Sequence, residues 1–599
     1  MMAPSPKEVL TDLRLQALTV FLLATIIRGL PLLKFSAWGI DFGIYSGLTN
    51  SFLKSGKLFP PYHGWGASYQ YFPTLYVFTA ALHFVTGLPI SRVLAYSAPA
   101  VGGLIVLILF LITRAVLPKQ DHFVAYLTGV LLAVNTIHVF QTSKPYNLLF
   151  GHLFLLLTFY LWSLSPKKRW AYYLAYASAL LLILSHHLST YMFLISFAGA
   201  VSFKALFSKW NAERVKKDVA LLSFSLTATL LYWYVAVPPL KRWTESFFHL
   251  PLLYLLLLSP LFYPTLLHLL SWLHPHVHRR VKKKHRVEPT ISYPLFVAST
   301  VLMGVALVII GAYGIGPINL SRNPKYLLLS IPTVVIMGLG VAGVKHMKRH
   351  PTLLGWTCAI LLSLLLTGLT WSRTLFPERH MEYLVEVLSI SSAMGVWSVI
   401  KVYYQKEVRR PRILPFGKRS LRRGLPVIVT LLIVSSGFIS SPDIIGGDVF
   451  SEGISEADFM AVQYMAGNLS KNYTVATDHR LGTLLNTTYG FPCTFERARE
   501  IWVSDNLSKY LYELEGNNSQ YPPIGYVLID DVMVNDSLVL VDNGPHGAVV
   551  VIDMWEHEKF SGEPFVLLER FESPDGHWAE VYAVNLTATY PIRDRECQL

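Results

Sequence analysis

The chain has 599 residues, of which 53% are hydrophobic and only 15% are charged. This composition excludes an intrinsically disordered chain, a coiled coil and an ordinary soluble enzyme. The charge is divided unevenly: residues 441–599 hold 25 acidic and 9 basic residues, whereas residues 1–440 hold 12 acidic and 42 basic residues. The basic charge requires no nucleic acid as a partner, because cytoplasmic loops beside anionic lipid are basic in membrane proteins.

Apolar stretches long enough to cross a bilayer recur along residues 1–440 and predict a polytopic α-helical membrane protein. Its first apolar run is expected to be a true span and not a cleaved signal peptide, because the run is long and no small-residue cleavage site follows. We place thirteen spans, near residues 15–33, 94–113, 122–140, 148–164, 170–185, 190–207, 219–238, 251–273, 291–313, 326–344, 352–371, 383–401 and 425–440.

Basic loops predict the orientation of these spans. Most of the bases fall in seven connecting segments: 1–14, 114–121, 165–169, 204–218, 274–290, 345–351 and 401–424. Lys and Arg are enriched in cytoplasmic loops, and thirteen spans place all seven segments, with the N-terminus, on that side. A further apolar stretch at 72–88 is therefore expected to be a juxtamembrane or re-entrant helix within a long external loop, 34–93. The alternative is a protein with fourteen spans, in which the first basic segment lies on the opposite side of the membrane from the other six.

By this topology, residues 441–599 form an external soluble domain of a multi-pass plasma membrane protein. Sequons for Asn glycosylation agree, because all of them fall on the predicted external side. They begin at Asn319, Asn468, Asn472, Asn486, Asn506, Asn517, Asn535 and Asn585. Cys493 and Cys597 share this region, and a disulfide or two free thiols are both open.

The external region is predicted to be a small α/β domain. A helix is expected at 455–470, with Ser455 as its cap and Asp458 three residues later. Strands are expected at 473–477, 524–529, 547–554 and 564–571, and the turn PDGHW at 574–578 predicts a terminal hairpin.

The candidate chemistry lies in the few carboxylates that residues 1–440 place on the external side. They are Asp41, Glu245, Glu378, Glu382 and Glu386. A carboxylate near apolar walls is costly and usually has a partner or a task, such as taking a proton from an acceptor hydroxyl. Asp41 lies in a loop rich in aromatic residues, Gly and Pro, and it is the candidate catalytic base. The alternative is that Asp41 caps a helix at 42–54.

Basic side chains at the outer ends of three spans are candidates for binding a lipid phosphate or pyrophosphate. Arg322 and Lys325 lie in SRNPKY, and Arg379 and His380 lie beside Glu378 and Glu382 in TLFPERHMEYL. The segment SHHLSTYM adds His186 and His187, so a pocket containing these histidines, Glu378 and Glu382 is predicted. For each of these bases the alternative is snorkelling and anchoring at the membrane interface.

The order of these features resembles the GT-C superfamily of polyprenyl-phosphate-dependent glycosyltransferases. One span is followed by a long external loop with an early acidic residue, the helix segment YFPTLY at 71–76, many spans and an external C-terminal domain. The superfamily includes protein mannosyltransferases, aminoarabinose transferases and the catalytic subunit of oligosaccharyltransferase. The resemblance implies a metal-independent, inverting transfer from a polyprenyl (dolichyl)-phosphate sugar to a glycan, lipid or protein acceptor. Asp41 would be the base, and Arg322, Lys325, Arg379 and His380 would hold the donor phosphate.

Two departures from the family pattern qualify this expectation. Many members carry a second acid in the next catalytic loop, where this chain has Lys144 and Asn147 in QTSKPYN. The segment TDHRLG at 477–482 stands where oligosaccharyltransferase has its WWDYG acceptor motif, which argues against recognition of a peptide sequon. No cofactor is expected, although a divalent metal is not excluded. A lipid or solute transporter and a non-catalytic scaffold for the external domain are the competing functions.

Overall fold

The computed structural model describes residues 12–62, 66, 68–118, 121–282, 298, 300–302, 305, 325–369, 377–404, 431, 434–436, 451–494, 498–515, 522–536, 538–541, 549–552 and 555–585. The chain divides into two compact units. The helical unit comprises Met1–Arg28, Pro99–Ser143 and Asn147–Ser441, and the mixed unit comprises Gly29–Ala98, Lys144–Tyr146 and Pro442–Leu599. The long loop after the first span and a short central segment thus belong with the C-terminal region.

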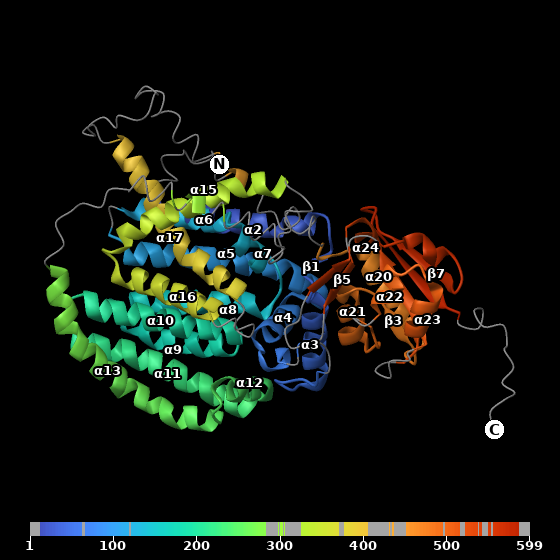
Figure 1. Ribbon diagram of the computed structural model, residues 1–599, viewed down its shortest axis with the longest axis horizontal. Coiled ribbons are helices and arrows are strands. Elements are labelled where there is room, and N and C mark those ends of the chain that lie inside the picture. Colours follow the sequence, from blue (N-terminus) through green and yellow to red (C-terminus); the bar gives the residue numbers. More distant parts are fainter. Residues whose placement is uncertain are drawn as a thin grey trace. The chain divides into compact units, whose positions relative to one another are not determined.

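The helical unit is built from long apolar helices (Figure 1). Its described helices are α2 (Leu13–Gly29), α5 (Ile90–Val116, of which residues 90–98 belong to the mixed unit), α6 (His122–Ala133), α7 (Thr136–Thr142), α8 (Asn147–Leu164), α9 (Arg169–Ile183), α10 (His187–Phe207), α11 (Ala212–Ala236), α12 (Pro238–Phe248), α13 (Leu252–Lys282), α15 (Lys325–Met347), α16 (Pro351–Leu369) and α17 (Pro377–Tyr404). Among the described residues, six helices are long and apolar enough to cross a membrane, or seven if α6 and α7 form one broken span.

The predicted spans and the observed helices coincide in most of the described chain. The span expected at 122–140 is broken, because α6 and α7 meet at 65° and Asn135 caps the new helix by accepting from the His138 backbone N–H. The spans expected at 291–313 and 425–440 fall almost wholly outside the described residues, so the count of thirteen stays a prediction. The helix expected at 72–88 is α4 (Thr74–Thr86), whose 13 residues are fewer than the roughly 20 that a span requires.

Helices in this unit approach closely at small residues. A Cβ added to Gly199 of α10 would lie 2.4 Å from the Gly355 carbonyl oxygen of α16, and the reverse contact would be 2.2 Å. The α15–α17 pair has the same character, since a Cβ at Gly343 would overlap the Ser391 carbonyl. Small residues that let helix backbones touch are the usual means of packing helices in a bilayer, where apolar burial alone gives little attraction.

The mixed unit combines short helices with three small sheets (Figure 1). Its described elements are η1 (Leu30–Leu33), β1 (Ala37–Trp38), α3 (Phe42–Ser55), η2 (Tyr69–Tyr71), α4, β2 (Gly453–Ile454), α20 (Glu456–Asn468), β3 (Thr474–Ala476), α21 (His479–Leu484), η5 (Leu485–Tyr489, a π-helical turn), α22 (Arg499–Val503), α23 (Leu507–Leu514), β4 (Ile524–Asp530), α24 (Asp531–Asn535), β5 (Leu538–Val541), β6 (Val549–Ile552), η6 (His557–Ser561), β7 (Phe565–Glu572) and β8 (Trp578–Val584).

The larger sheet has the order β3-β4-β8-β7, with β3 and β4 parallel and the other pairs antiparallel. The other two sheets each pair two strands, β1 with β2 and β5 with β6. The predicted start of the helix at 455–470 is confirmed: α20 begins with a capping box in which Ser455 accepts from the Asp458 backbone and Asp458 accepts from the Ser455 backbone. The expected hairpin is also present, as β7 and β8. Cys597 lies outside the described residues.

Candidate active site

Asp41 immediately precedes α3, but its carboxylate does not cap that helix. The Oδ1 atom lies 3.3 Å from His479 Nε2, and Oδ2 accepts from the Tyr69 hydroxyl at 3.3 Å. The side chain is 11% exposed, whereas His479 is fully buried. Helix capping, the alternative use of Asp41, is therefore absent, and the accessible member of the Asp41–His479 pair is the carboxylate.

His479 reaches Asp41 because two helices of the mixed unit touch. His479 is the first residue of α21, whose N-terminus is capped by Asp478 accepting from the Leu481 backbone at 3.0 Å. A Cβ on Gly43 of α3 would lie 2.3 Å from the Leu484 backbone nitrogen, so only glycine permits this approach. The sequence did not predict a role for His479. The segment TDHRLG was interpreted only as a replacement for the WWDYG acceptor motif, and no local pattern connects His479 to Asp41.

A second carboxylate, Glu452, organises the backbone of the Asp41 loop. Its Oε2 accepts from the Ile40 backbone at 3.0 Å and from the Tyr146 hydroxyl at 3.2 Å, and its Oε1 accepts from Lys144 Nζ. The Tyr146 hydroxyl in turn accepts from the Asp41 backbone N–H at 3.3 Å. Glu452 and Lys144 are 1% and 2% exposed. Lys144, which the sequence marked only as a departure from the family pattern, is thus part of this loop, and Glu452 had no signal in the sequence.

Tyrosine hydroxyls around Asp41 remain proton donors at neutral pH. Burial raises the pKa of Tyr146 well above its usual range, and the charges of Glu452 and Asp41 raise it further. Burial and the charge of Asp41 likewise raise the pKa of Tyr62. The Tyr45 ring stacks on that of Tyr69 at 5.6 Å between centroids. The Asp41 side chain therefore faces hydroxyl donors and aromatic rings, which suits a carboxylate that accepts a proton from a bound hydroxyl.

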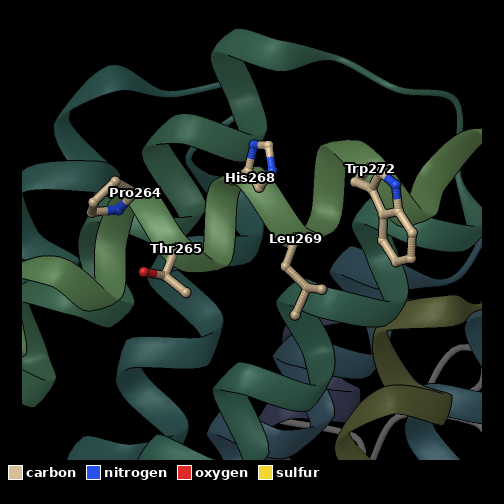
Figure 2. A pocket seen from close by; sticks show the side chains of 5 residues that line it. All are labelled: Pro264, Thr265, His268, Leu269 and Trp272. Carbon is tan, nitrogen blue, oxygen red and sulfur yellow. The ribbon is translucent and has the colours of Figure 1, made fainter.

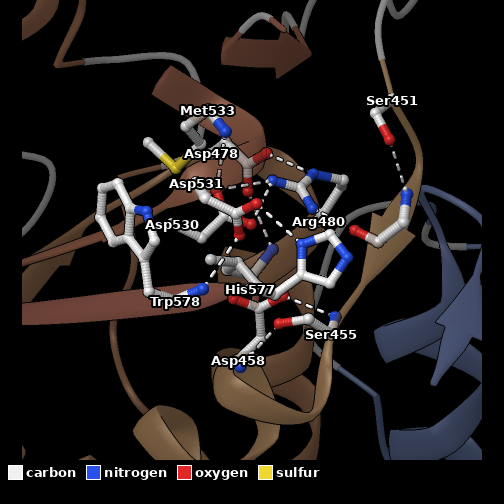
Figure 3. Close-up of polar contacts among 12 residues, drawn as sticks. Ser451, Ser455, Asp458, Asp478, Arg480, Asp530, Asp531, Met533, His577 and Trp578 are labelled. Atoms are coloured by element: carbon white, nitrogen blue, oxygen red, sulfur yellow. Dashed lines mark hydrogen bonds and ion pairs between the residues drawn. The ribbon is translucent and has the colours of Figure 1, made fainter. Parts of the chain in front are cut away.

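A buried ionic network anchors the same region of the mixed unit (Figure 3). Arg480 Nε donates to Asp478 at 2.7 Å, Nη2 contacts both Asp530 oxygens at 3.1 and 2.9 Å, and Nη1 donates to the Gly453 carbonyl of β2. Burial lowers the pKa of Arg480, but the carboxylates of Asp478 and Asp530 outweigh it, so the net shift is upward. Because β2 pairs with β1 just before Asp41, this network helps to fix the loop that carries Asp41.

The predicted donor-phosphate residues of the helical unit fall into separate groups. Arg379 Nη1 donates to Glu382 at 2.9 Å and to Gln141 at 3.2 Å, and its side chain is 41% exposed. His380 points elsewhere and lies 2.8 Å from Ser363 of α16. Arg322 lies outside the described residues, and the side chains of Lys325 and Glu378 are not described.

His186 and His187 begin α10, and a hydrogen-bonded chain links the first of them to α17. His186 Nδ1 lies 2.9 Å from Ser189 Oγ, which lies 2.6 Å from the Tyr383 hydroxyl. Nδ1 also accepts from the Ser189 backbone N–H at 3.3 Å, so the proton of a neutral ring belongs on Nε2. Arg379 and Tyr383 share one face of α17 at i, i+4 spacing. Arg379 and His186 each offer hydrogen-bond donors in the helical unit.

His138, His152 and Glu386 form a buried group in the helical unit with possible ligand atoms within 4.8 Å of one another. Arg28 Nη2 lies 2.7 Å from His138 Nδ1. A guanidinium only donates, so Nδ1 holds a lone pair and the proton of a neutral His138 ring lies on Nε2, which lies 3.9 Å from Glu386. These residues form a network in which Arg28 and Glu386 offset each other's charge, and their ligand atoms are close enough together to hold a metal ion.

A surface hollow on α13 does not resemble a catalytic site (Figure 2). One helix supplies all of its lining residues: Pro264, Thr265, His268, Leu269 and Trp272. Leu269 and Trp272 are 45% and 59% exposed, as expected of side chains that face lipid.

Comparison with solved structures identifies the class of fold. The oligosaccharyltransferase of Archaeoglobus fulgidus in its apo form matches with a TM-score of 0.54 at 13% identity, over 90% of this chain and 74% of that protein. A structure of that enzyme in complex with Zn and sulfate matches with a TM-score of 0.53 at 13% identity, over 89% and 73%. ArnT from Cupriavidus metallidurans, with a TM-score of 0.44 at 12% identity over 94% and 97%, is too distant to add an argument.

The chain is a helical membrane protein with a GT-C-like fold, as the sequence predicts. No protein-family model matches the sequence, and comparison with curated proteins gives no match.

Proposed function

We propose that the protein is a membrane glycosyltransferase that moves a sugar from a polyprenyl-phosphate donor to a glycan, lipid or protein acceptor. The observation that carries this proposal is the state of Asp41. In a GT-C-like fold, this carboxylate keeps 11% of its side chain exposed, does not cap its helix and is held between His479 and Tyr69. A carboxylate that is oriented but still accessible is suited to act as a general base.

The proposed reaction is one displacement. Asp41 takes the proton of the acceptor hydroxyl while the acceptor oxygen attacks the anomeric carbon of the donor sugar. The bond between that carbon and the phosphate oxygen breaks, and the polyprenyl phosphate leaves with the electron pair. Configuration at the anomeric carbon is inverted. His479 touches Asp41 but is buried, so we assign it as a positioning residue and not as the base.

We assign the donor phosphate to Arg379 and His186 in the helical unit. Arg379 is partly exposed and offers a planar fork of donors, which matches phosphate geometry. A neutral His186 offers Nε2–H as a further donor, because its Nδ1 is an acceptor toward Ser189. Arg322 and Lys325 remain proposed phosphate ligands from the sequence. Because His380 is buried against Ser363, we do not place it in this group.

The remaining assignments follow from the sequence. We propose thirteen spans, a cytoplasmic N-terminus and an external α/β region in the plasma membrane. We expect that the TDHRLG segment does not bind a peptide sequon. The side chains of Asp478, His479 and Arg480 are fully buried and contact other groups of the protein, which supports this expectation.

Donor turnover tests the proposed function. Purified protein in nanodiscs would be incubated with radiolabelled polyprenyl-phosphate sugars and native membrane acceptors, and released polyprenyl phosphate and labelled acceptor would be measured. Equal amounts of both products are expected. Flux of lipid or solute in proteoliposomes without sugar transfer would favour a transporter, and neither activity would favour a scaffold; both results contradict the proposal.

A further inference from the structure

Two carboxylates share the Asp41 loop, and their charges require compensation. Asp41 and Glu452 are joined through the Tyr146 hydroxyl, which accepts from the Asp41 backbone and donates to Glu452. Both are mostly shielded from water. Negative charges held close together with little solvent repel each other, so a nearby cation stabilises such an arrangement.

The donor set around these carboxylates does not fit a divalent metal. Asp41 already accepts from His479 and Tyr69, one on each oxygen. Glu452 accepts on both oxygens as well, from Lys144 on one side and from Tyr146 and the Ile40 backbone on the other. Metal sites of this kind gather several acceptor oxygens around one point. Here the groups that face the two carboxylates are hydrogen-bond donors, and one of them is an ammonium, which repels a divalent cation.

We propose that Lys144, held by Glu452, is the resident cation of the Asp41 loop and that the sugar transfer requires no divalent metal. This inference rests on the proposed function. Lys144 does not act on the substrate: it is a positioning residue whose ion pair with Glu452 fixes the backbone at Ile40 and Asp41. The oligosaccharyltransferase neighbour has been obtained with Zn, so the inference separates this chain from a protein of the same fold.

The first experiment measures metal directly. Full-length protein in nanodiscs would be treated with EDTA, and transfer would be assayed with and without added Mn²⁺, Mg²⁺ or Zn²⁺. Bound metal would be measured by mass spectrometry before and after treatment. We expect the rate to change by less than about twofold, a difference too small for a lost catalytic cation, and the protein to contain no stoichiometric metal.

The second experiment tests the ion pair between Lys144 and Glu452. Lys144→Met is expected to lower kcat by about 10- to 100-fold and to leave the KM for the donor near its wild-type value, because the loop backbone that Glu452 holds would move and a displaced base loses reaction geometry. Lys144→Arg keeps the charge and is expected to retain most of the wild-type kcat. Lys216→Met, which breaks an exposed ion pair with Glu213 in the helical unit, is the matched control and should change neither quantity.

Three results would overturn the inference: activity that EDTA abolishes and a divalent cation restores, a stoichiometric metal ion that Asp41→Asn releases, or an unchanged kcat in folded Lys144→Met. If Lys144→Met does not fold, the wild-type metal measurements and Lys144→Arg still decide the matter. Absence of transfer from every donor would count against the proposed function instead, and the metal content of the folded protein would still test the resident cation.

Discussion

At the scale of single residues, the site depends on which atoms of Asp41 are engaged. Each carboxylate oxygen accepts one long hydrogen bond, at 3.3 Å, so a lone pair on each oxygen remains for a substrate hydroxyl. His479 is buried and orients the Asp41 carboxylate, whereas the carboxylate itself stays accessible to solvent. Orientation and basicity are therefore supplied by different residues.

Replacing His479 with Phe keeps a ring of similar size but removes the donor to Asp41. We expect kcat to fall by about 10²-fold, because a base displaced by about 1 Å loses reaction geometry, while the KM for the donor stays near its wild-type value. Steady-state kinetics would measure both. His557→Phe is the control, because His557 contacts Glu580 of β8 and not Asp41. Equal losses in the two variants would contradict the role of His479.

At the scale of elements, the site exists because α3 touches α21 and η5. Gly43 and Gly47 lie at i, i+4 spacing on one face of α3. An added Cβ at Gly43 would meet the Leu484 backbone at 2.3 Å, and one at Gly47 would meet Thr487 at 2.5 Å. The contact brings together residues more than 400 positions apart in the chain, including Asp41 and His479.

Gly43→Ala is expected to push α3 away from α21. Because the obstructing atoms are backbone, the cost should resemble that of overpacking a core, about 1–3 kcal/mol of unfolding free energy, and transfer should fall with it. Chemical denaturation followed by tryptophan fluorescence would measure the stability.

Gly467→Ala in α20 is the matched substitution, because an added Cβ there meets nothing within 4 Å. It should be neutral or stabilise the protein by up to about 1 kcal/mol. The explanation would fail if the two substitutions had the same effect.

The sequence predicts elements whose signals are local. Ser455 and Asp458 are three residues apart, and their capping box is present as expected. Asp41 could be singled out because external carboxylates are few. Its partners could not: Glu452 and His479 belong to segments whose own sequence forms a strand edge and a short helix, and only the folded chain brings them to residue 41. The sequence singled out Lys144 only because it lies in a loop where many family members carry an acid.

At the scale of the whole molecule, each unit uses buried charge differently. The helical unit offsets Arg28 and Glu386 through His138. The mixed unit surrounds Arg480 with acids, and burial, together with the charge of Asp478, raises the pKa of Asp530 to about 6 despite the opposing effect of Arg480. Burial and the charge of Asp530 also raise the pKa of Asp458 well above its usual range. Folding of the mixed unit therefore favours the protonated forms of Asp530 and Asp458.

This uptake of protons predicts how stability depends on pH. Because the folded pKa of Asp530 is raised, its contribution is fully present below about pH 4 and is lost as the pH rises through about 6. Thermal unfolding of the full-length protein would be followed by tryptophan fluorescence between pH 4.5 and 7.5, a window chosen to cover this change.

Asp458→Asn removes one of the two titrations and keeps the side-chain shape. The Tm of the variant minus the Tm of the wild type should therefore become more positive as the pH rises. A difference that does not depend on pH would show that these acids do not take up protons on folding.

The central claim is that Asp41 is the base of a sugar transfer, and the most direct measurement compares Asp41→Asn with wild type in donor turnover. Asparagine keeps the size of the side chain but cannot take the proton, so we expect the rate to fall by about 10²–10⁴-fold with an unchanged Tm. Full transfer by a folded Asp41→Asn protein would contradict the account.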